Sequence, residues 1–126
     1  MNKLFLYSFL ILALYILSGY DKTKDISGTA TGLKNKTNLN LPMNLFTLAI
    51  IIVILLEVVG SLFILYSTYT DKHKVQAAYT TLALAGFTIL ATLIYHQPTS
   101  QKEYYAFLKN LGLIGGLLLL ADTLNK

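Results

Sequence analysis

The stretch LFTLAIIIVILLEVVGSLFILY, residues 45–66, decides the fold. It is apolar except for Thr47, Glu57 and Ser61. A helix rises about 1.5 Å per residue, so roughly 20 such residues cross the hydrocarbon core of a bilayer. The stretch therefore predicts a membrane-spanning helix over about residues 43–69, and Pro42 suits the start of that helix because its missing N–H is not needed there.

Three further apolar runs lie outside this stretch, at about residues 4–20, 75–95 and 104–121. They are continuous rather than alternating, which argues against the strands of a membrane barrel. Short loops join the second run to the third and the third to the fourth, so consecutive helices should be antiparallel neighbours. The sequence predicts an all-α fold, a transmembrane four-helix bundle of up-down topology that forms a single domain over residues 1–126.

The first run has two interpretations. A basic start at Lys3, an apolar stretch and the small residues Ser18 and Gly19 are also typical of a cleaved signal peptide. The run is longer than the usual apolar region of such a peptide, and no small-x-small pair ends it cleanly. We therefore favour a retained first helix.

The polar segment 21–42 is rich in lysine, asparagine and glycine, and we interpret it as a solvated connector that could contain a short interfacial turn. Lysine counts leave the orientation open, because the two sides of the membrane carry nearly equal numbers. One side has Lys3, Lys72, Lys74 and Lys126, and the other has Lys22, Lys24, Lys34, Lys36 and Lys102.

The composition excludes several classes of protein. Charged residues make up 13% of the chain, against about 25% in soluble domains, and this shortage argues against a soluble enzyme, a disordered chain and a coiled coil. The absence of cysteine excludes disulfides, thiolate zinc sites and iron–sulfur clusters. The lysines form no basic face interleaved with aromatic residues, so we expect no nucleic-acid partner. His73 and His96 lie too far apart along one helix to share a ligand, and we expect no metal site.

Polar groups gather where the first run ends, the second begins, the third ends and the fourth begins. In an up-down bundle these ends share one side of the membrane. They carry Ser18, Gly19, Asp21, Lys22, Asn44, Tyr95, His96, Tyr104, Tyr105, Lys109 and Asn110.

Glu57 lies about 18 Å along the second helix from Leu45, near the middle of the membrane. A charged group there costs about 2.5–3.5 kcal/mol on an insertion scale, so Glu57 should face the bundle interior, either protonated or paired. Gly60 and Ser61 share its face and would let a neighbouring helix approach. A structural interhelical hydrogen bond and a role in ligand or proton handling both remain open for Glu57.

Lys109 also has two interpretations. Its side chain could extend to the membrane surface. Alternatively, Gly112 and Gly116 share its face and form a close-packing motif, which would place Lys109 at a helix interface. A direct pair with Glu57 would be strained, because the two depths differ by about 10 Å, so water or a ligand would have to bridge them. His96 ends the third run as an interfacial histidine, and no third group orients it toward Ser18 for hydrolase chemistry.

Four motifs in this order resemble those of the DoxX family of small four-helix membrane proteins. They are Ser18-Gly19-Tyr20-Asp21-Lys22, Leu56-Glu57-Val58-Val59-Gly60, Leu93-Ile94-Tyr95-His96, and Phe107-Leu108-Lys109-Asn110-Leu111 with Gly115-Gly116. The resemblance implies cytoplasmic termini and association with membrane oxidoreductase systems, including quinone-linked thiosulfate oxidation. The functional residues that it implies are Lys22, Glu57, His96, Lys109 and Asn110.

Two functions follow as hypotheses. In the first, the chain is an accessory subunit of a quinone-linked oxidoreductase. Lys109, Asn110 and His96 bind the quinone head group, and Glu57 relays a proton. No intrinsic cofactor is expected, so electrons would come from a partner subunit or from the bound quinone. In the second, the chain is a non-catalytic membrane scaffold, assembly factor or cargo receptor. A small transporter is a weaker third idea that would require an oligomer of the chain.

Overall fold

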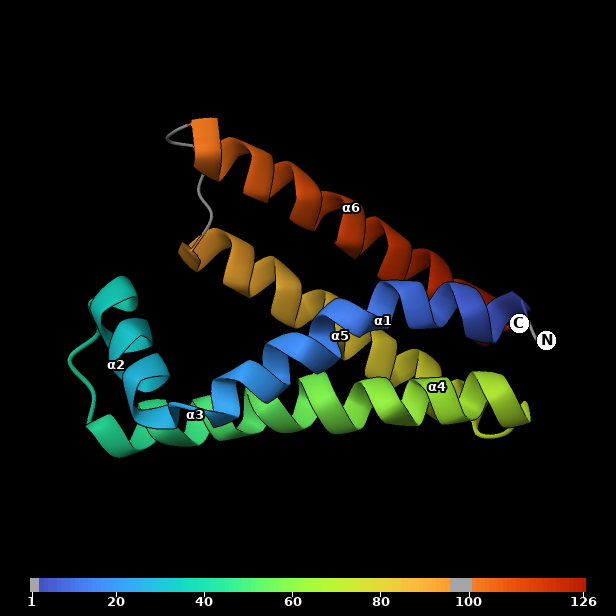
Figure 1. The fold of residues 1–126 in the computed structure, drawn as a ribbon, viewed down its shortest axis with the longest axis horizontal. Helices are drawn as coiled ribbons and strands as arrows, with labels where there is room; N and C mark the ends of the chain where they lie inside the picture. The colour runs from blue at the N-terminus through green and yellow to red at the C-terminus, as the bar shows by residue number, and fades with distance from the viewer. Residues whose placement is uncertain (1–2, 96–100) are drawn as a thin grey trace.

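The computed structural model describes residues 3–95 and 101–126, and these residues form helices and their connections (Figure 1). The elements in chain order are α1 (Lys3–Thr23), α2 (Ile26–Thr37), α3 (Met43–Leu55), the π-helical turn η1 (Leu56–Gly60), α4 (Ser61–Thr70), α5 (Lys74–Tyr95) and α6 (Gln101–Leu124). The predicted all-α membrane bundle is confirmed.

Four stretches of helix are long and apolar enough to cross a membrane: Lys3–Thr23, Met43–Thr70, Lys74–Tyr95 and Glu103–Leu124. They agree with the predicted spans to within a few residues. The second is a continuous helix made of α3, η1 and α4, with 28 residues against 21 in α1. Because each residue adds about 1.5 Å, this helix is roughly 10 Å longer than α1, and the start of α3 extends past the end of α1 (Figure 1).

The segment 21–42, expected to be a solvated connector with at most a short interfacial turn, instead contains the 12-residue helix α2 at Ile26–Thr37. Asp25 caps its start by accepting a hydrogen bond from the backbone N–H of Gly28 at 2.9 Å. Asn38 ends it in the left-handed conformation, with φ of 57°. These two caps satisfy backbone groups that an uncapped short helix would leave to water, which stabilises a sequence of modest helix propensity.

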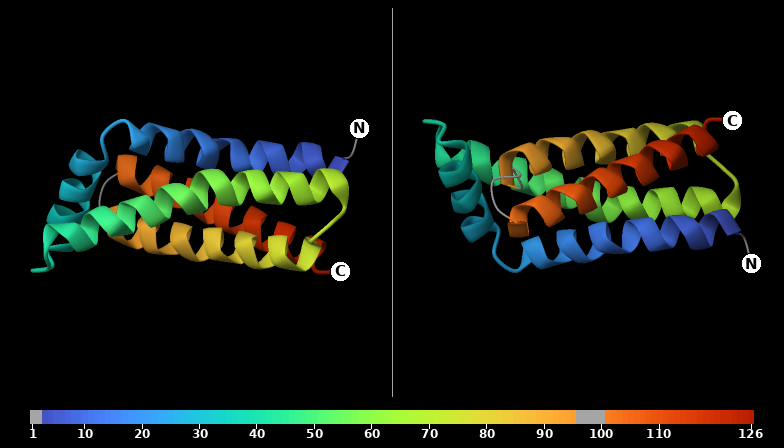
Figure 2. Two further views of the ribbon diagram at one scale, coloured as in Figure 1. Left: turned by 90° about the horizontal axis from the view of Figure 1, so that it is seen from below. Right: turned by 90° about the horizontal axis from the view of Figure 1, so that it is seen from above.

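The apolar face of α2 packs on the part of α3 that extends past α1. Ala30, Phe46 and Ile50 are buried in this contact, and Ile26, Leu33, Met43 and Ile54 pack around them. Helix α2 therefore lies across one end of the bundle, as the two views in Figure 2 show. The N- and C-termini and the turn between α4 and α5 lie together at the opposite end (Figure 2).

The main core is formed by α1, α4, α5 and α6. Its buried members are Leu12, Tyr15, Ile64, Leu65, Ala77, Ala78, Leu84, Ala85, Leu117, Leu120 and Leu124. Two of the residues expected at helix contacts lie at close approaches: Ser61 is fully buried, and a Cβ on Gly60 would be 3.1 Å from Thr80 Cγ2 of α5.

Only one of the two glycines expected to form a close-packing motif on α6 lies at a helix contact. A Cβ on Gly116 would lie 3.7 Å from Ile11 of α1, but nothing lies within 4 Å of the equivalent point on Gly112, which is exposed. The physical reason is the direction of α6, which separates from α1 toward the α2 end of the bundle (Figure 1). The two glycines share a helix face, but only Gly116 has a helix opposite it.

Candidate functional site

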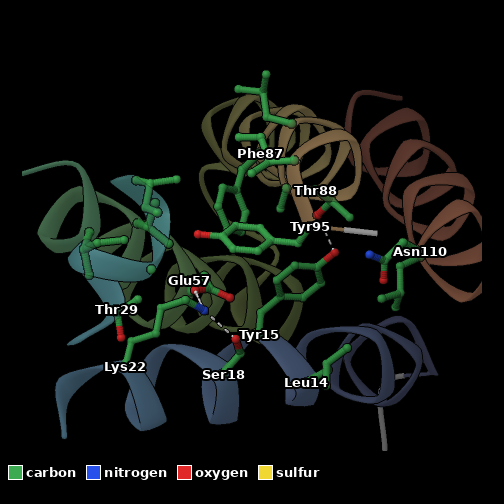
Figure 3. A pocket seen from close by; sticks show the side chains of 18 of the residues that line it. Leu14, Tyr15, Ser18, Lys22, Thr29, Glu57, Phe87, Thr88, Tyr95 and Asn110 are labelled. Carbon is green, nitrogen blue, oxygen red and sulfur yellow. Dashed lines mark hydrogen bonds and ion pairs between the residues drawn. The ribbon is translucent and has the colours of Figure 1, made fainter. Parts of the chain in front are cut away.

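A cavity of about 630 Å³ occupies the α2 end of the bundle (Figure 3). Residues of α1, α2, α3, η1, α5 and α6 line it, and apolar side chains form most of its wall. Its polar lining residues are Tyr15, Ser18, Lys22, Thr29, Glu57, Thr88, Tyr95, Lys109 and Asn110. A mostly apolar cavity with a few converging polar groups is the usual form of a small-molecule site.

An ion pair between Lys22 and Glu57 joins α1 to η1 at this cavity. Lys22 Nζ lies 2.8 Å from Glu57 Oε1 and also donates to Ser18 Oγ at 2.7 Å (Figure 3). The Glu57 side chain is 3% exposed and that of Lys22 is 23% exposed. A charge in so apolar a place requires a partner, and Lys22 supplies it.

The Ser-Gly-x-x-Lys sequence of α1 builds this arrangement. Ser18 and Lys22 are four residues apart, so their side chains meet on one helix face. A Cβ on Gly19 would lie 2.6 Å from Val58 Cγ2 and 3.0 Å from Glu57 Cβ. Glycine therefore lets the backbone of α1 lie directly against η1, and Lys22, nearly one turn further along, falls beside Glu57.

Glu57 lies in a π-helical turn, Leu56–Gly60, set within an otherwise α-helical stretch. A π turn holds an additional residue, which changes the direction in which the following side chains point, and such turns are frequent at functional sites. In this bundle η1 contacts α1 and α5. The turn therefore occurs where the long α3–α4 helix meets two neighbours, and it holds Glu57, the one buried charged residue among those that the structure describes.

Two hydrogen bonds connect α5 to its neighbours on the other wall of the cavity. The hydroxyls of Tyr15 and Thr88 lie 2.7 Å apart in a buried contact between α1 and α5. Asn110 of α6 donates from Nδ2 to Thr92 Oγ1 at 3.0 Å. Both threonines also donate to the carbonyl of the preceding helical turn of α5. These bonds fix the polar wall from three helices at once.

The model of the DoxX family matches residues 5–97 of the chain, nearly three quarters of its length. The chain belongs to the DoxX family. It is also similar to the inner membrane protein YqjF of Escherichia coli (strain K12), with 32% identity over 111 residues that cover 87% of this chain and 75% of that protein. No solved structure matches the chain. This DoxX protein is therefore a multi-pass integral membrane protein with four candidate spans.

The DoxX family match includes Lys22 and Glu57 and ends before Lys109 and Asn110. The organisation of residues 1–126 as one domain stays a prediction. In the structure, Lys22, Glu57, Lys109 and Asn110 all line the same cavity. His96 lies outside the described residues.

The partner of Glu57 in this DoxX protein is Lys22 rather than Lys109. Because α3 extends past the end of α1 (Figure 1), the end of α1 lies against the long helix near its middle, where a Cβ on Gly19 would be 3.0 Å from Glu57 Cβ. Lys109 instead lies on an exposed part of α6 at the edge of the cavity.

Sequence reasoning missed Tyr15, Thr88 and Thr92 as members of the polar wall. A signal was present in the third apolar run, where Thr81, Thr88 and Thr92 recur at spacings of seven and four residues. Such spacing marks one helix face. All three threonines are buried. Within the part of the chain that the structure describes, no group of three or more His, Cys, Asp or Glu side chains could hold a metal ion.

Proposed function

We propose that this DoxX-family protein is an accessory subunit of a quinone-linked membrane oxidoreductase and that the cavity binds the quinone. The observation that carries the proposal is a cavity of about 630 Å³ with a fixed polar wall inside a membrane bundle. Ligand cavities in proteins commonly measure about 300–1,000 Å³. A ring with two polar oxygens and an apolar tail suits a site of this size and mixed character.

The lining offers separate places for the two parts of such a ligand. Lys109 and the second N–H of Asn110 are hydrogen-bond donors for a ring oxygen. Leu14 and Leu90 line the cavity and are also 43% and 61% exposed, so the cavity wall continues to the outer surface of the bundle. An apolar tail would lie along these residues and reach the lipid.

The ion pair provides a route for protons. Reduction of a quinone to a hydroquinone consumes two electrons and two protons. Glu57 and Lys22 are joined by a hydrogen bond, and Lys22 is the more exposed of the two. Glu57 would pass a proton between the cavity and Lys22. Because the chain has no cysteine and hence no thiolate ligands, the electrons would come from a partner subunit.

The proposal also includes the membrane in which the protein lies and the orientation of the protein in it. The relative YqjF is named an inner membrane protein, and we assign this chain to the same kind of membrane. Both termini lie at the end of the bundle opposite α2 (Figure 2). With cytoplasmic termini, as the family resemblance implies, α2 and the cavity would lie toward the outer face of that membrane.

A scaffold or assembly factor is the second candidate, and one observation favours it. Gly112 and Gly115 on α6 are exposed, with open space where a side chain would be. A helix of another membrane subunit or of a second copy could approach α6 closely there. Purification from native membranes separates the candidates, since copurifying oxidoreductase subunits favour the first and other envelope proteins favour the second.

Titration with a decyl-substituted benzoquinone tests the quinone proposal. We expect Lys109→Ala and Asn110→Ala each to weaken binding by about three- to tenfold, because each removes a hydrogen-bond donor to a ring oxygen. Lys74→Ala is the matched control, because Lys74 lies at the opposite end of the bundle beside Asp71. Unchanged binding in both cavity variants would contradict the assignment of the site.

A further inference from the structure

The hydroxyl proton of Tyr15 has a defined direction. Thr88 Oγ1 donates to the carbonyl of Leu84 at 2.8 Å, and it lies 2.7 Å from the hydroxyl oxygen of Tyr15. A threonine hydroxyl has one proton and a carbonyl can only accept. Both bonds therefore form only if Tyr15 donates to Thr88. With its proton used in this way, the hydroxyl oxygen of Tyr15 can act toward the cavity only as an acceptor.

The hydrogen bonds of Thr92 fix the orientation of the Asn110 amide in the same way. Thr92 Oγ1 donates to the carbonyl of Thr88 at 2.6 Å, so it can receive but not give a further hydrogen bond. Asn110 Nδ2 donates to that oxygen at 3.0 Å. The reverse orientation of the amide would bring two acceptors together. Asn110 Oδ1 is therefore turned away from Thr92 and available as an acceptor in the residue's position on the cavity wall.

We propose that Tyr15 and Asn110 form an acceptor wall that recognises a hydroxyl group of the ligand, so that the cavity binds a hydroquinone in preference to the corresponding quinone. This inference rests on the proposed function and names the redox form of the ligand. Tyr15 and Asn110 are specificity-determining residues, and Thr88 and Thr92 act through them by fixing their hydrogen-bond directions.

The preference follows from matching donors to acceptors. A quinone carbonyl only accepts, so it satisfies Lys109 but leaves Tyr15 facing another acceptor. A hydroquinone oxygen can accept from Lys109 and at the same time donate to the acceptor wall. Burying an acceptor without a donor loses the hydrogen bond that water had supplied, and this loss is larger than the gain from a typical hydrogen bond.

Three probes distinguish the chemistry: a decyl-substituted benzoquinone, its hydroquinone kept reduced under argon, and the dimethyl ether of that hydroquinone. The ether retains the ring and tail but has no hydroxyl proton. Dissociation constants are measured with the full chain in lipid nanodiscs. We expect the hydroquinone to bind about three- to tenfold more tightly than the other two, the effect of one hydrogen bond.

Thr88→Val provides the sharpest variant, because it keeps the shape of Thr88 and removes the oxygen that receives the Tyr15 proton. Tyr15 then becomes a donor toward the cavity, so the ratio of hydroquinone to quinone affinity should fall by about threefold or more and can reverse. Thr88→Ser retains the hydroxyl and should retain the wild-type ratio. Ratios are compared between variants, so unequal partition of the probes into lipid cancels.

Tyr15→Phe is the second variant, since it removes the acceptor outright and does not depend on Thr88→Val folding well. It should abolish the part of the preference that Tyr15 supplies without reversing it. If all three probes bind wild-type protein equally and neither variant changes the ratio, the acceptor wall is refuted while the cavity remains a quinone site. If none of the probes binds, the proposed function fails and this inference fails with it.

Discussion

Gly19 lies against Glu57 so closely that a Cβ at position 19 would be 3.0 Å from the Cβ of the glutamate. The same approach brings Lys22 to 2.8 Å from Glu57 Oε1. The close packing of α1 on η1 and the ion pair between Lys22 and Glu57 therefore depend on each other in this protein. The glycine sets the distance between α1 and η1, and the lysine neutralises the carboxylate that this distance buries.

Gly19→Ala should separate α1 from η1. The new methyl group would lie 2.6 Å from Val58 Cγ2 and 3.0 Å from the Cβ of Glu57, which is fixed by the backbone and cannot move away by side-chain rotation. We expect a loss of about 1–3 kcal/mol in unfolding free energy, the usual cost of overpacking, measured by thermal or denaturant unfolding in detergent.

Gly86→Ala is the matched control for this change, because nothing lies within 4 Å of the corresponding point on Gly86. There the helix propensity of alanine should stabilise α5 by up to about 1 kcal/mol. Val58→Ala in the Gly19→Ala background should recover part of the lost stability. Equal stability of the Gly19→Ala and Gly86→Ala proteins would show that α1 and η1 are not in close contact.

Lys22→Met should destabilise the protein by about 3–5 kcal/mol, because it leaves the carboxylate of Glu57 buried without its cation. Replacing both partners, as in Lys22→Met with Glu57→Gln, should restore most of this loss. The measurement is a double-mutant cycle in unfolding free energy. Additive effects of the two single changes would contradict a direct interaction between these side chains.

The surface pair of Lys74 and Asp71 provides the comparison for that cycle. Asp71 is largely exposed, and the two residues are three positions apart at the start of α5. Exposed pairs contribute about 0–1 kcal/mol, so Lys74→Met should change stability little. If Lys74→Met lowered the unfolding free energy as much as Lys22→Met does, burial would not explain the importance of the pair between Lys22 and Glu57.

Gly32→Leu should obstruct the cavity without disturbing the fold. Gly32 lines the cavity from α2, and nothing lies within 4 Å of the point where its Cβ would be. We expect quinone binding to weaken by more than about tenfold while the unfolding temperature is unchanged or rises, since leucine favours helix. Gly86→Leu, on the exposed side of α5, should bind normally. Normal binding by Gly32→Leu would place the ligand elsewhere.

Asp25→Ala should loosen α2, because it removes the cap at the first turn of that helix. The expected cost is about 1 kcal/mol, seen as faster hydrogen exchange of α2 amides. Gly28→Ala should have a similar effect, because its methyl group would collide with the Asp25 carboxylate. In the Asp25→Ala background, Gly28→Ala should no longer destabilise, and a further loss there would refute the proposed collision.

The topology can be tested with single cysteines, because the natural chain has none. Cysteines at Thr31 and Asn35 in α2 should react with a membrane-impermeant reagent from one side. Cysteines at Asp71 and Asn125 should react from the other, since the termini lie at the end opposite α2 (Figure 2). Labelling of Thr31→Cys and Asn125→Cys from the same side would contradict the three spans that lie between these positions.

The helices that cross the membrane could be predicted from the sequence because their signal is local. Uninterrupted apolar length is a property of each segment alone, and it located the spans to within a few residues. The helix α2 gave no comparable signal. It depends on the Asp25 cap and on contacts of Ala30 with Phe46 and Ile50, which exist only after α3 is placed.

Some residues of the site could be predicted from the sequence, but the ion pair between Lys22 and Glu57 could not. Apolar context alone identified Glu57 as a buried charge, and the family motif identified Lys22. Their contact depends on the relative lengths of α1 and the α3–α4 helix and on the approach at Gly19, which are relationships between segments. Tyr15 escaped notice because a single tyrosine in an apolar run has no distinctive local signature, and Thr88 was marked only by its spacing from Thr81 and Thr92.

The exposed position of Leu14 and Leu90 on the cavity wall has a consequence for pharmacology. A compound that reaches the site along these residues is drawn from the surrounding lipid, which acts as its reservoir. Its apparent potency should then depend on its mole fraction in the bilayer rather than on its total concentration in the buffer. Adding empty liposomes at constant dose would weaken such a compound by dilution, even though the protein itself is unchanged.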